Sequence, residues 1–471
     1  MTLKQKINQL GWKKVLAITV LAAIDVFTIA APYYLKSLIP NIHLYLNVEE
    51  SDVSQMTAII GWVTLIMQIP SGWLTDKFSS RWLLIVSVII TGLVTFWFGS
   101  LILESSKLST SVLRGQYYAI FAIWGVSSTL LFWAPLWKLV SLQADKENQG
   151  LVYGLQGSLN GVIGLVFVFA IGLIVQLVTQ SYVSQNSTNS NYRYDTAFVV
   201  YIYIFGLILL LTAFGLYFFV KEKKSLEKVG VKFKDLILCM QDWRVWALSF
   251  FLLGMYMFQS TFAYFLNQML INVVELPGIA LIVIGGIRLY GLRFAISAWV
   301  GKISDRLSSL TLALIVALFL GFILVVIFIF LPELYNTNSE PVKITVQVFM
   351  VLIFFMTSVL SWIMVTLRYA QIGEIKRPAN SYGTVTAVLS FVGFSSDAWF
   401  YQVASSIQDK AIYQKPESGK IITNQTGYQI IIAIGIGVAF LGLFMGFLVW
   451  YSNYRMMRPY GIRYYRWREL N

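Results

Sequence analysis

Long apolar runs alternate with short polar segments along the chain. A helix needs about 20 mainly apolar residues to cross the hydrocarbon core of a bilayer, and twelve runs in this sequence reach that length. We therefore expect an all-α membrane protein with 12 transmembrane helices. The predicted spans are residues 15–37, 53–74, 82–104, 113–141, 150–178, 196–220, 244–272, 276–300, 309–332, 344–369, 380–407 and 427–452.

The longest charged interruption, residues 220–242, leaves six predicted helices on each side. We therefore expect an N-terminal six-helix bundle over residues 1–220 and a cytoplasmic central loop over 221–243. A C-terminal six-helix bundle should span 244–452, followed by a basic cytoplasmic tail over 453–471. The first apolar run is too long for the apolar core of a signal peptide, so we interpret it as a retained membrane helix.

Basic residues predict the orientation, because the cytoplasmic loops of membrane proteins are enriched in Lys and Arg. With both termini inside, about 25 of the 35 basic residues fall on the cytoplasmic side. An even number of helices agrees with this arrangement. The sequence thus predicts a multi-pass protein of the cell (plasma) membrane with both termini in the cytoplasm.

The composition is typical of a chain embedded in lipid. Charged residues make up 12% of the sequence and hydrophobic residues 58%, whereas a soluble domain carries about 25% charged residues. The net charge of +13 is explained by cytoplasmic loops that face anionic lipid headgroups, so nucleic acid is not an expected partner. Because the chain has one Cys and one His, it cannot form an intramolecular disulfide or a metal site built from several His side chains. We expect no cofactor, no metal and a monomer in the lipid bilayer.

A short charged loop occurs twice. SGWLTDKFSSRWLL begins at Ser71 and VGKISDRLSSLTLAL begins at Val300, and Gly72 and Gly301 are 301 − 72 = 229 residues apart. The same offset relates Trp133 to Trp362. An offset shared by separate loops predicts that the two halves are an internal repeat of six helices.

Two six-helix halves, a basic central loop and this loop motif resemble the major facilitator superfamily. The residues that match the loop motif and its weaker second copy are Gly72, Asp76, Lys77, Arg81, Gly301, Asp305 and Arg306. The resemblance implies two pseudo-symmetric bundles and a cytoplasmic gate in which these residues latch the inner side during alternating access. The alternative is ordinary enrichment of positive charge on the inside. Segments 132–161 and 377–401 are similar to a poorly characterised bacterial permease branch near the organophosphate and nitrate transporters.

Four charged residues lie well inside predicted helices, away from their ends, where each costs roughly 2.5–3.5 kcal/mol to insert. Arg288 suits the carboxylate or phosphate of an anionic substrate, or it forms an internal ion pair with Asp25 or Asp397. Asp25 is a proton- or cation-coupling carboxylate, a partner for a substrate amine, or the partner of Arg288. Arg293 is interpreted as a structural or gating charge. Asp397 is a weaker candidate that could cap a local polar cluster.

The candidate charges do not follow the repeat. Position 288 − 229 = 59 is Ile59, and position 25 + 229 = 254 is Gly254. Pseudo-symmetric halves around one asymmetric site would have this pattern. Polar and aromatic residues that could complete the substrate or coupling site are Trp133, Asn160, Gln259, Tyr264 and Trp362, although each is more often a packing residue.

Glycines recur every three or four residues between Gly150 and Gly164 in the predicted fifth helix. This spacing places small residues on one stripe, which favours close helix packing over ligand binding.

These observations predict a secondary active transporter of a small polar solute, expected to be anionic, with or without a coupled proton or ion. No G-x-x-x-x-G-K-[ST] motif for ATP binding is present, so gradients are the expected energy source. One alternative is a proton- or cation-coupled permease for a neutral or cationic solute such as a sugar, nucleoside or drug. A polytopic membrane sensor or enzyme is the alternative of another class. An enzyme is not expected, since the predicted helices hold no cluster of acid–base groups.

Overall fold

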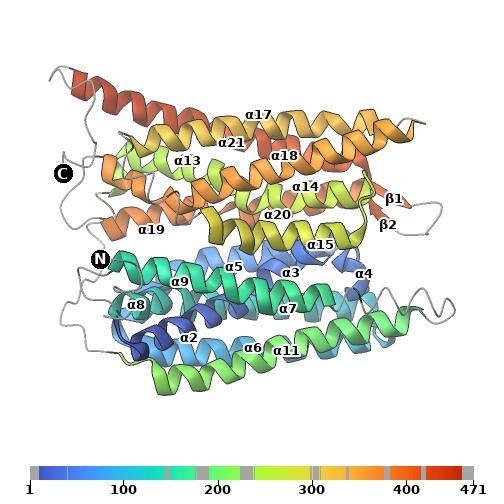
Figure 1. The fold of residues 1–471 in the computed structure, drawn as a ribbon, viewed down its shortest axis with the longest axis horizontal. Coiled ribbons are helices and arrows are strands. Elements are labelled where there is room, and N and C mark those ends of the chain that lie inside the picture. The colour runs from blue at the N-terminus through green and yellow to red at the C-terminus, as the bar shows by residue number, and fades with distance from the viewer. Residues whose placement is uncertain are drawn as a thin grey trace. The chain divides into compact units, whose positions relative to one another are not determined.

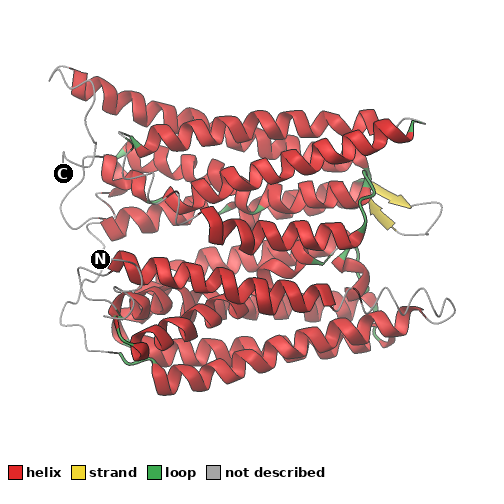
Figure 2. Ribbon diagram, viewed as in Figure 1, coloured by secondary structure: helices red, strands yellow, loops and turns green. Residues whose placement is uncertain are grey.

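The computed structural model describes residues 10–39, 41–143, 149–174, 177, 190–222, 237, 239–296, 300, 307, 309–335, 339–375, 382–414 and 421–458. Nearly all of this part of the chain is helical (Figure 1, Figure 2). The strands found in it are β1 (Ile412–Gln414) and β2 (Ile421–Thr423), which pair as a short antiparallel hairpin. The predicted all-α fold is confirmed.

Ten helices of the described chain are long and apolar enough to cross a membrane. The two remaining predicted spans, 53–74 and 380–407, are also helical. The first corresponds to α5 (Glu50–Lys77), which is less apolar and has acidic residues in its first turn. The second is divided into α19 (Tyr382–Gly393) and α20 (Ser396–Lys410). Neither span is among the ten helices counted over the described residues.

The chain forms two compact units. Unit 1 comprises Met1–Gly230 and Gly278–Phe294, and unit 2 comprises Val231–Pro277 and Ala295–Asn471. Part of the predicted eighth span, 276–300, therefore belongs to unit 1, although it follows the charged central segment. The sequence-based division into bundles at residues 220 and 244 stays a prediction.

Unit 1 contains the sequence-distant segments that matter for the site, because α9 packs along α2 and α15 packs against α3. Its elements are α2 (Trp12–Ile29), η1 (Ala30–Tyr34), α3 (Leu35–Leu38), α4 (Ile42–Leu46), α5, α6 (Ser80–Glu104), η2 (Ser105–Lys107), α7 (Thr110–Ser128), η3 (Thr129–Trp133), α8 (Ala134–Leu142), α9 (Gln149–Ile163), η5 (Gly164–Ala170), α11 (Ser190–Phe219), α15 (Gly278–Gly286) and η6 (Ile287–Gly291).

In unit 2, α13 is central, because it packs against α21, α19 and α18. Gly254 on α13 and Gly442 on α21 allow backbone contact, since a Cβ added to Gly442 would lie 2.8 Å from the Cα of Gly254. The elements are α13 (Trp243–Gln259), α14 (Thr261–Asn272), α17 (Leu310–Tyr335), α18 (Glu340–Leu367), η7 (Ala370–Glu374), α19, α20, β1, β2 and α21 (Gln425–Met457).

Several helices widen or break within their predicted membrane spans. In unit 1, η1, η3, η5 and η6 are π-helical turns inside four such spans. In unit 2, α13 ends at Gln259 and α14 begins at Thr261, with Ser260 between them at φ −100° and ψ −72°. Single π-turns occur frequently at functional sites, and irregular backbone at membrane depth is tolerated where it is buried in protein or lines a cavity. Polar side chains near these breaks are therefore the first candidates for a functional site.

Two glutamates hold the helix starts that follow the repeated loops. Glu222 accepts hydrogen bonds from Ser79 Oγ at 2.5 Å and from the backbone N–H groups of Ser80 at 3.0 Å and Arg81 at 3.2 Å, at the start of α6. Glu374 accepts bonds from Ser309 Oγ at 3.0 Å, from Leu310 N–H and from Thr311 N–H at 3.1 Å, at the start of α17. A carboxylate at a helix N-terminus satisfies free N–H groups and complements the helix dipole.

The predicted gate lies largely outside the described structure. Gly301, Asp305 and Arg306 are not among the described residues, and the surroundings of Gly72 and Asp76 within α5 are not described either. Lys77 is exposed at the end of α5. The guanidinium of Arg81 lies over the rings of Trp82, at 5.9 Å, and Tyr217, at 5.8 Å. The latch in which these residues take part stays a prediction.

The Glu222 cap is expected to weaken in acid. Burial alone would raise the pKa of Glu222, but bonds from Ser79 and from the backbone of Arg81 and Ser80 outweigh it and lower the pKa. The cap is therefore complete above the ordinary glutamate pKa of about 4.3 and is lost as the pH falls through the lowered value. Glu222→Gln, which mimics the protonated side chain, should destabilise the first turn of α6 by about 1 kcal/mol at pH 7.

Hydrogen exchange of the Ser80 and Arg81 amides measures this effect. These amides should exchange roughly fivefold faster in Glu222→Gln at pH 7, with the difference shrinking towards pH 3.5. The matched control is Glu340→Gln, because Glu340 is exposed and pairs with Lys343 at 3.4 Å. A pH-independent difference between wild type and Glu222→Gln would contradict the charge-based cap.

Candidate substrate-binding site

Asp25 lies in α2 and is 1% exposed. Two amide side chains of α9 donate to one of its carboxylate oxygens, Oδ2: Gln156 Nε2 at 2.9 Å and Asn160 Nδ2 at 2.6 Å. Both donors lie on one face of α9, because residues four apart in a helix are neighbours. Hydrogen bonds to an ionised acceptor are roughly twice as strong as neutral ones, so the pair offsets part of the cost of burying this carboxyl group.

Arg293 joins the same network. It follows η6 in the chain and donates from Nη1 to Oδ1 of Asn160 at 2.7 Å. Asn160 therefore bridges a carboxylate and a guanidinium, with its N–H facing Asp25 and its carbonyl facing Arg293. Three segments far apart in the sequence are connected through this one amide. Of the two arginines in the predicted eighth helix, Arg293 is thus connected to Asp25 through Asn160.

The segment that carries Arg288 and Arg293 is packed unusually closely against η5. A Cβ added to Gly164 would lie 2.0 Å from Cδ1 of Tyr290, and one added to Gly286 would lie 2.0 Å from Cδ2 of Phe169. Gly161 meets Phe294, with its nearest atom at 3.1 Å, whereas Gly157 has nothing within 4 Å. The predicted packing role of the glycine stripe thus holds at Gly161 and Gly164, and not at Gly157.

Arg288 lies in η6 and is 5% exposed. Its neighbour Tyr290 meets Tyr34 of η1 edge to face, with ring centroids 6.2 Å apart. Tyr33, also in η1, forms hydrogen bonds with Ser128 at 3.0 Å and Thr64 at 3.3 Å. The π-turns of unit 1 therefore carry both the buried arginine and a polar contact between helices.

Asp397 lies in unit 2, where it is bound from the broken helix. Tyr256 donates to its Oδ2 at 2.6 Å, and the hydroxyl of Ser260 donates to its Oδ1. Tyr401 donates to the carbonyl oxygen of Ser260 at 3.3 Å. This geometry matches the expectation that Asp397 caps a local polar cluster, and it places that cluster at the break between α13 and α14.

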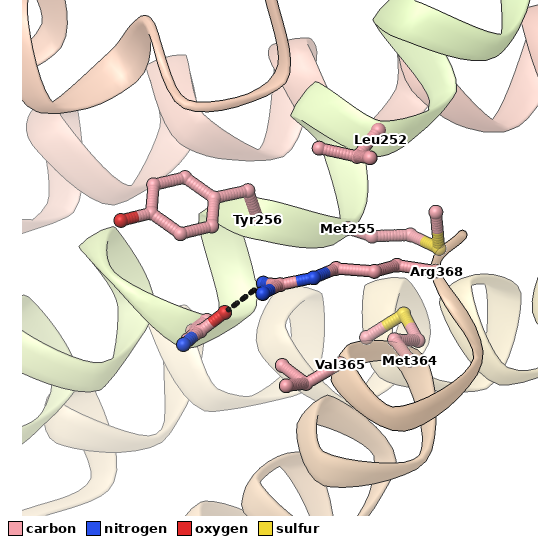
Figure 3. Close-up of a pocket in the computed structure, with 7 residues that line it drawn as sticks. Leu252, Met255, Tyr256, Met364, Val365 and Arg368 are labelled. Atoms are coloured by element: carbon pink, nitrogen blue, oxygen red, sulfur yellow. Dashed lines mark hydrogen bonds between the residues drawn. The ribbon is translucent and has the colours of Figure 1, made fainter. Parts of the chain in front are cut away.

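In unit 2, an arginine lines a pocket. Arg368, the first residue after α18, donates from Nη1 to Oε1 of Gln259 at 3.1 Å. Figure 3 shows its side chain extended between α13 and α18. The residues that line the pocket are Leu252, Met255, Tyr256, Gln259, Met364, Val365 and Arg368.

The other predicted pocket residues are spread over both units. In unit 1, Trp133 is half-buried in η3, with its ring 5.2 Å from that of Phe132. In unit 2, Tyr264 and Trp362 are buried on α14 and α18. Asn160 and Gln259 are brought into arginine contacts, and Trp133, Tyr264 and Trp362 are not among the lining residues of the Arg368 pocket.

Arg368 is a site residue that the sequence did not single out. Arg368 ends the predicted span 344–369, where a basic residue is explained by the orientation rule, and nothing in the sequence shows that its side chain turns toward Gln259. Gln156 stands four residues before Asn160, so the two amides share one face of a predicted helix, and this spacing is a usable signal. The described residues contain no group of three or more His, Cys, Asp or Glu side chains that could hold a metal ion.

Comparison with known proteins identifies the family. The family model of the Major Facilitator Superfamily matches residues 15–400. The chain belongs to the major facilitator superfamily. It is therefore a multi-pass membrane protein of a family of secondary transporters, which agrees with its apolar helices.

Relatives and solved structures agree with this assignment. The "Uncharacterized protein MG294 homolog" of Mycoplasma pneumoniae (strain ATCC 29342 / M129 / Subtype 1) is 42% identical over 479 residues, covering 100% of this chain and 99% of that protein. The "Nitrite extrusion protein" of Bacillus subtilis (strain 168) is 30% identical over 145 residues, covering 31% of this chain and 33% of that protein. A crystal structure of the nucleoside transporter NupG has a TM-score of 0.60 at 12% identity, covering 92% of this chain and 98% of that chain, and supports the fold alone.

Proposed function

We propose that this major facilitator superfamily protein transports a small anionic solute by alternating access, with Arg288 as an anion-binding residue. The observation that carries the proposal is a guanidinium inside the fold, because Arg288 lies in η6 and is 5% exposed. A charged group inside a membrane helix is expensive to keep, so its presence there points to a function.

Two further features support this proposal. Guanidinium groups bind carboxylates and phosphates with bidentate geometry, and Arg288 lies in a π-turn, where functional residues are often found. The similarity of about a third of the chain to a nitrite extrusion protein is also consistent with an anionic solute.

Asp25 and Arg293 are proposed to act through conformation and coupling. Their connection through Asn160 links α2, α9 and the segment after η6, so a change in the charge of Asp25 would alter contacts on three helices. We propose Asp25 as the coupling carboxylate, both termini in the cytoplasm, a plasma-membrane location and a monomeric transporter.

The experiment begins with a thermal-shift screen of the purified protein against nitrate, nitrite, phosphate, carboxylates, phosphorylated sugars and nucleosides. The best stabiliser is then tested for uptake into proteoliposomes, with and without a pH gradient. Arg288→Gln should lower uptake kcat/KM at least tenfold, because a charged hydrogen bond contributes about 1.5–3 kcal/mol. Arg455→Gln is the matched control, since Arg455 is exposed in the last turn of α21.

The screen separates the proposal from its rivals. Unchanged uptake by folded Arg288→Gln would remove Arg288 from the site. The protein would instead be a permease for neutral solutes if it takes up a neutral sugar or nucleoside in response to a proton gradient, and if Arg288→Gln leaves this uptake unchanged.

A further inference from the structure

Arg368 is held in a defined orientation by aromatic rings. Its guanidinium carbon lies 5.0 Å from the ring centroid of Phe394 and 5.2 Å from that of Tyr369. The hydrogen bond to Gln259 fixes one edge of the same group. Cation–π contacts of this kind stabilise the charge and restrict the plane of the guanidinium. A rotamer-rich side chain is thereby oriented before any ligand arrives, which lowers the entropic cost of binding.

Arg368 and the polar residues around it are partly accessible. On α13 and at its end, Tyr256, Gln259 and Ser260 are half-buried, whereas their neighbours Met257 and Phe258 are almost fully buried. Arg368 is itself half-buried. In Figure 3, the side chain of Arg368 runs between Met255 on one side and Met364 on the other. Polar groups thus converge within a mostly apolar pocket, which is the usual character of a small-ligand site.

The chemistry of this pocket favours an oxyanion. A guanidinium has five N–H donors and no acceptor, and the hydrogen bond to Gln259 engages one nitrogen, Nη1. Apolar walls lower the local dielectric and strengthen a charge-assisted bond. The nearby carboxylate of Asp397 accepts hydrogen bonds from Tyr256 and Ser260. Tyr256 therefore connects Asp397 to the pocket.

We propose that Arg368, with Gln259 beside it, forms an anion-binding subsite in unit 2 for a small oxyanion such as nitrate, a carboxylate or phosphate. This subsite is distinct from Arg288, so it does not depend on the assignment of Arg288 to the transported solute.

The test measures anion binding to the full-length purified protein in detergent. Sodium nitrate, sodium acetate and sodium phosphate are each compared with sodium chloride at equal ionic strength, by the shift in Tm and by titration calorimetry. At least one oxyanion should raise the Tm relative to chloride, and Arg368→Gln should raise its Kd at least tenfold. Arg368→Lys should bind more weakly than wild type but better than Arg368→Gln, because it keeps the charge and loses the planar fork.

Gln259→Glu is an independent second variant. It places a carboxylate where the amide oxygen now accepts from Arg368, so an internal ion pair should replace the external anion. This variant should remain folded, with a Tm at least equal to that of wild type in chloride, and should lose the oxyanion-dependent shift. If Gln259→Glu and Arg368→Gln both lose the oxyanion-dependent shift in Tm, simple misfolding is excluded as the cause of that loss.

Arg288→Gln separates this proposal from the proposed transport function. It should keep the oxyanion shift that depends on Arg368, whatever it does to uptake. Three outcomes would overturn the subsite: no oxyanion stabilises the wild type more than chloride, Arg368→Gln keeps full affinity, or Arg288→Gln abolishes binding while Arg368→Gln does not.

Discussion

Asp25→Asn is expected to reduce transport at least 100-fold while leaving the protein folded. The carboxylate oxygen Oδ2 accepts from both Gln156 and Asn160. Its other oxygen, Oδ1, is buried without a hydrogen-bond partner among the described residues. In the variant, the amide oxygen can keep both donors, but the new NH₂ group would then occupy the place of Oδ1. A buried donor without an acceptor costs about 1–3 kcal/mol.

The loss of charge has a second effect, because Asn160 also binds Arg293. A neutral amide oxygen accepts a weaker hydrogen bond than a carboxylate does, so Asn160 is held less firmly and its bond to Arg293 is weakened. Uptake of the solute identified by the thermal-shift screen measures the result, with Glu340→Gln as the control for the same chemical change at an exposed position. Uptake within twofold of wild type would show that the charge of Asp25 is unnecessary.

The exchange variant Asp25→Asn with Asn160→Asp tests what the carboxylate does. It keeps one negative charge, moves it beside Arg293 and lets the amide at position 25 donate to it. Restored transport would mean that the network needs only a charge balance for Arg293. A folded exchange variant that does not transport would assign Asp25 a direct role with the solute or a coupled ion.

The helices could be predicted because membrane burial leaves few choices. A run of apolar residues in lipid must satisfy its backbone groups internally, and a helix does so within one segment. The runs at 15–37 and 309–332 therefore correspond to α2–α3 and α17 without any knowledge of their neighbours. The π-turns and the break at Ser260 were not predictable in the same way, since they depend on packing against other helices.

The site was predicted in part, for a related reason. A charge inside an apolar run stands out, so Asp25 and Arg293 were identifiable as residues that need an explanation. The bond that connects them runs through Asn160, and the register of α2 against α9 cannot be read from either segment alone. Glu222 was also out of reach, because it caps a helix start 143 residues earlier in the chain.

Gly164→Ala is expected to abolish transport, whereas Gly157→Ala should have little effect. A Cβ at position 164 would come within 2.0 Å of Cδ1 and 2.2 Å of Cε1 of Tyr290, far inside the 3.5–4.0 Å of ordinary carbon contacts. Tyr290 is 1% exposed, so its ring cannot swing into open space. Either the ring leaves its rotamer or η6 moves away from η5, and overpacking of this kind costs about 1–3 kcal/mol or more.

The penalty applies only while η5 and η6 are packed together. In a transporter that alternates between conformations, the population of states that contain this contact therefore falls about tenfold for each 1.4 kcal/mol of penalty. Hydrogen exchange of residues 278–294 should become faster in Gly164→Ala, and uptake should be lost. Gly157 lies on the same stripe of glycines, and a Cβ added there would meet nothing within 4 Å. The new methyl group only reduces the backbone freedom of the unfolded chain, so it should slightly raise the free energy of unfolding.

A second substitution on the opposite helix shows whether the clash is the cause. Tyr290→Ala removes the ring that the new methyl group would strike, so Gly164→Ala with Tyr290→Ala should exchange at residues 278–294 no faster than Tyr290→Ala alone. Additive effects of the two substitutions would place the damage elsewhere, because residues that do not interact contribute independently. A non-additive result would show that the close contact between Gly164 and Tyr290 holds the arginine-bearing segment against η5, beside the Asp25 network.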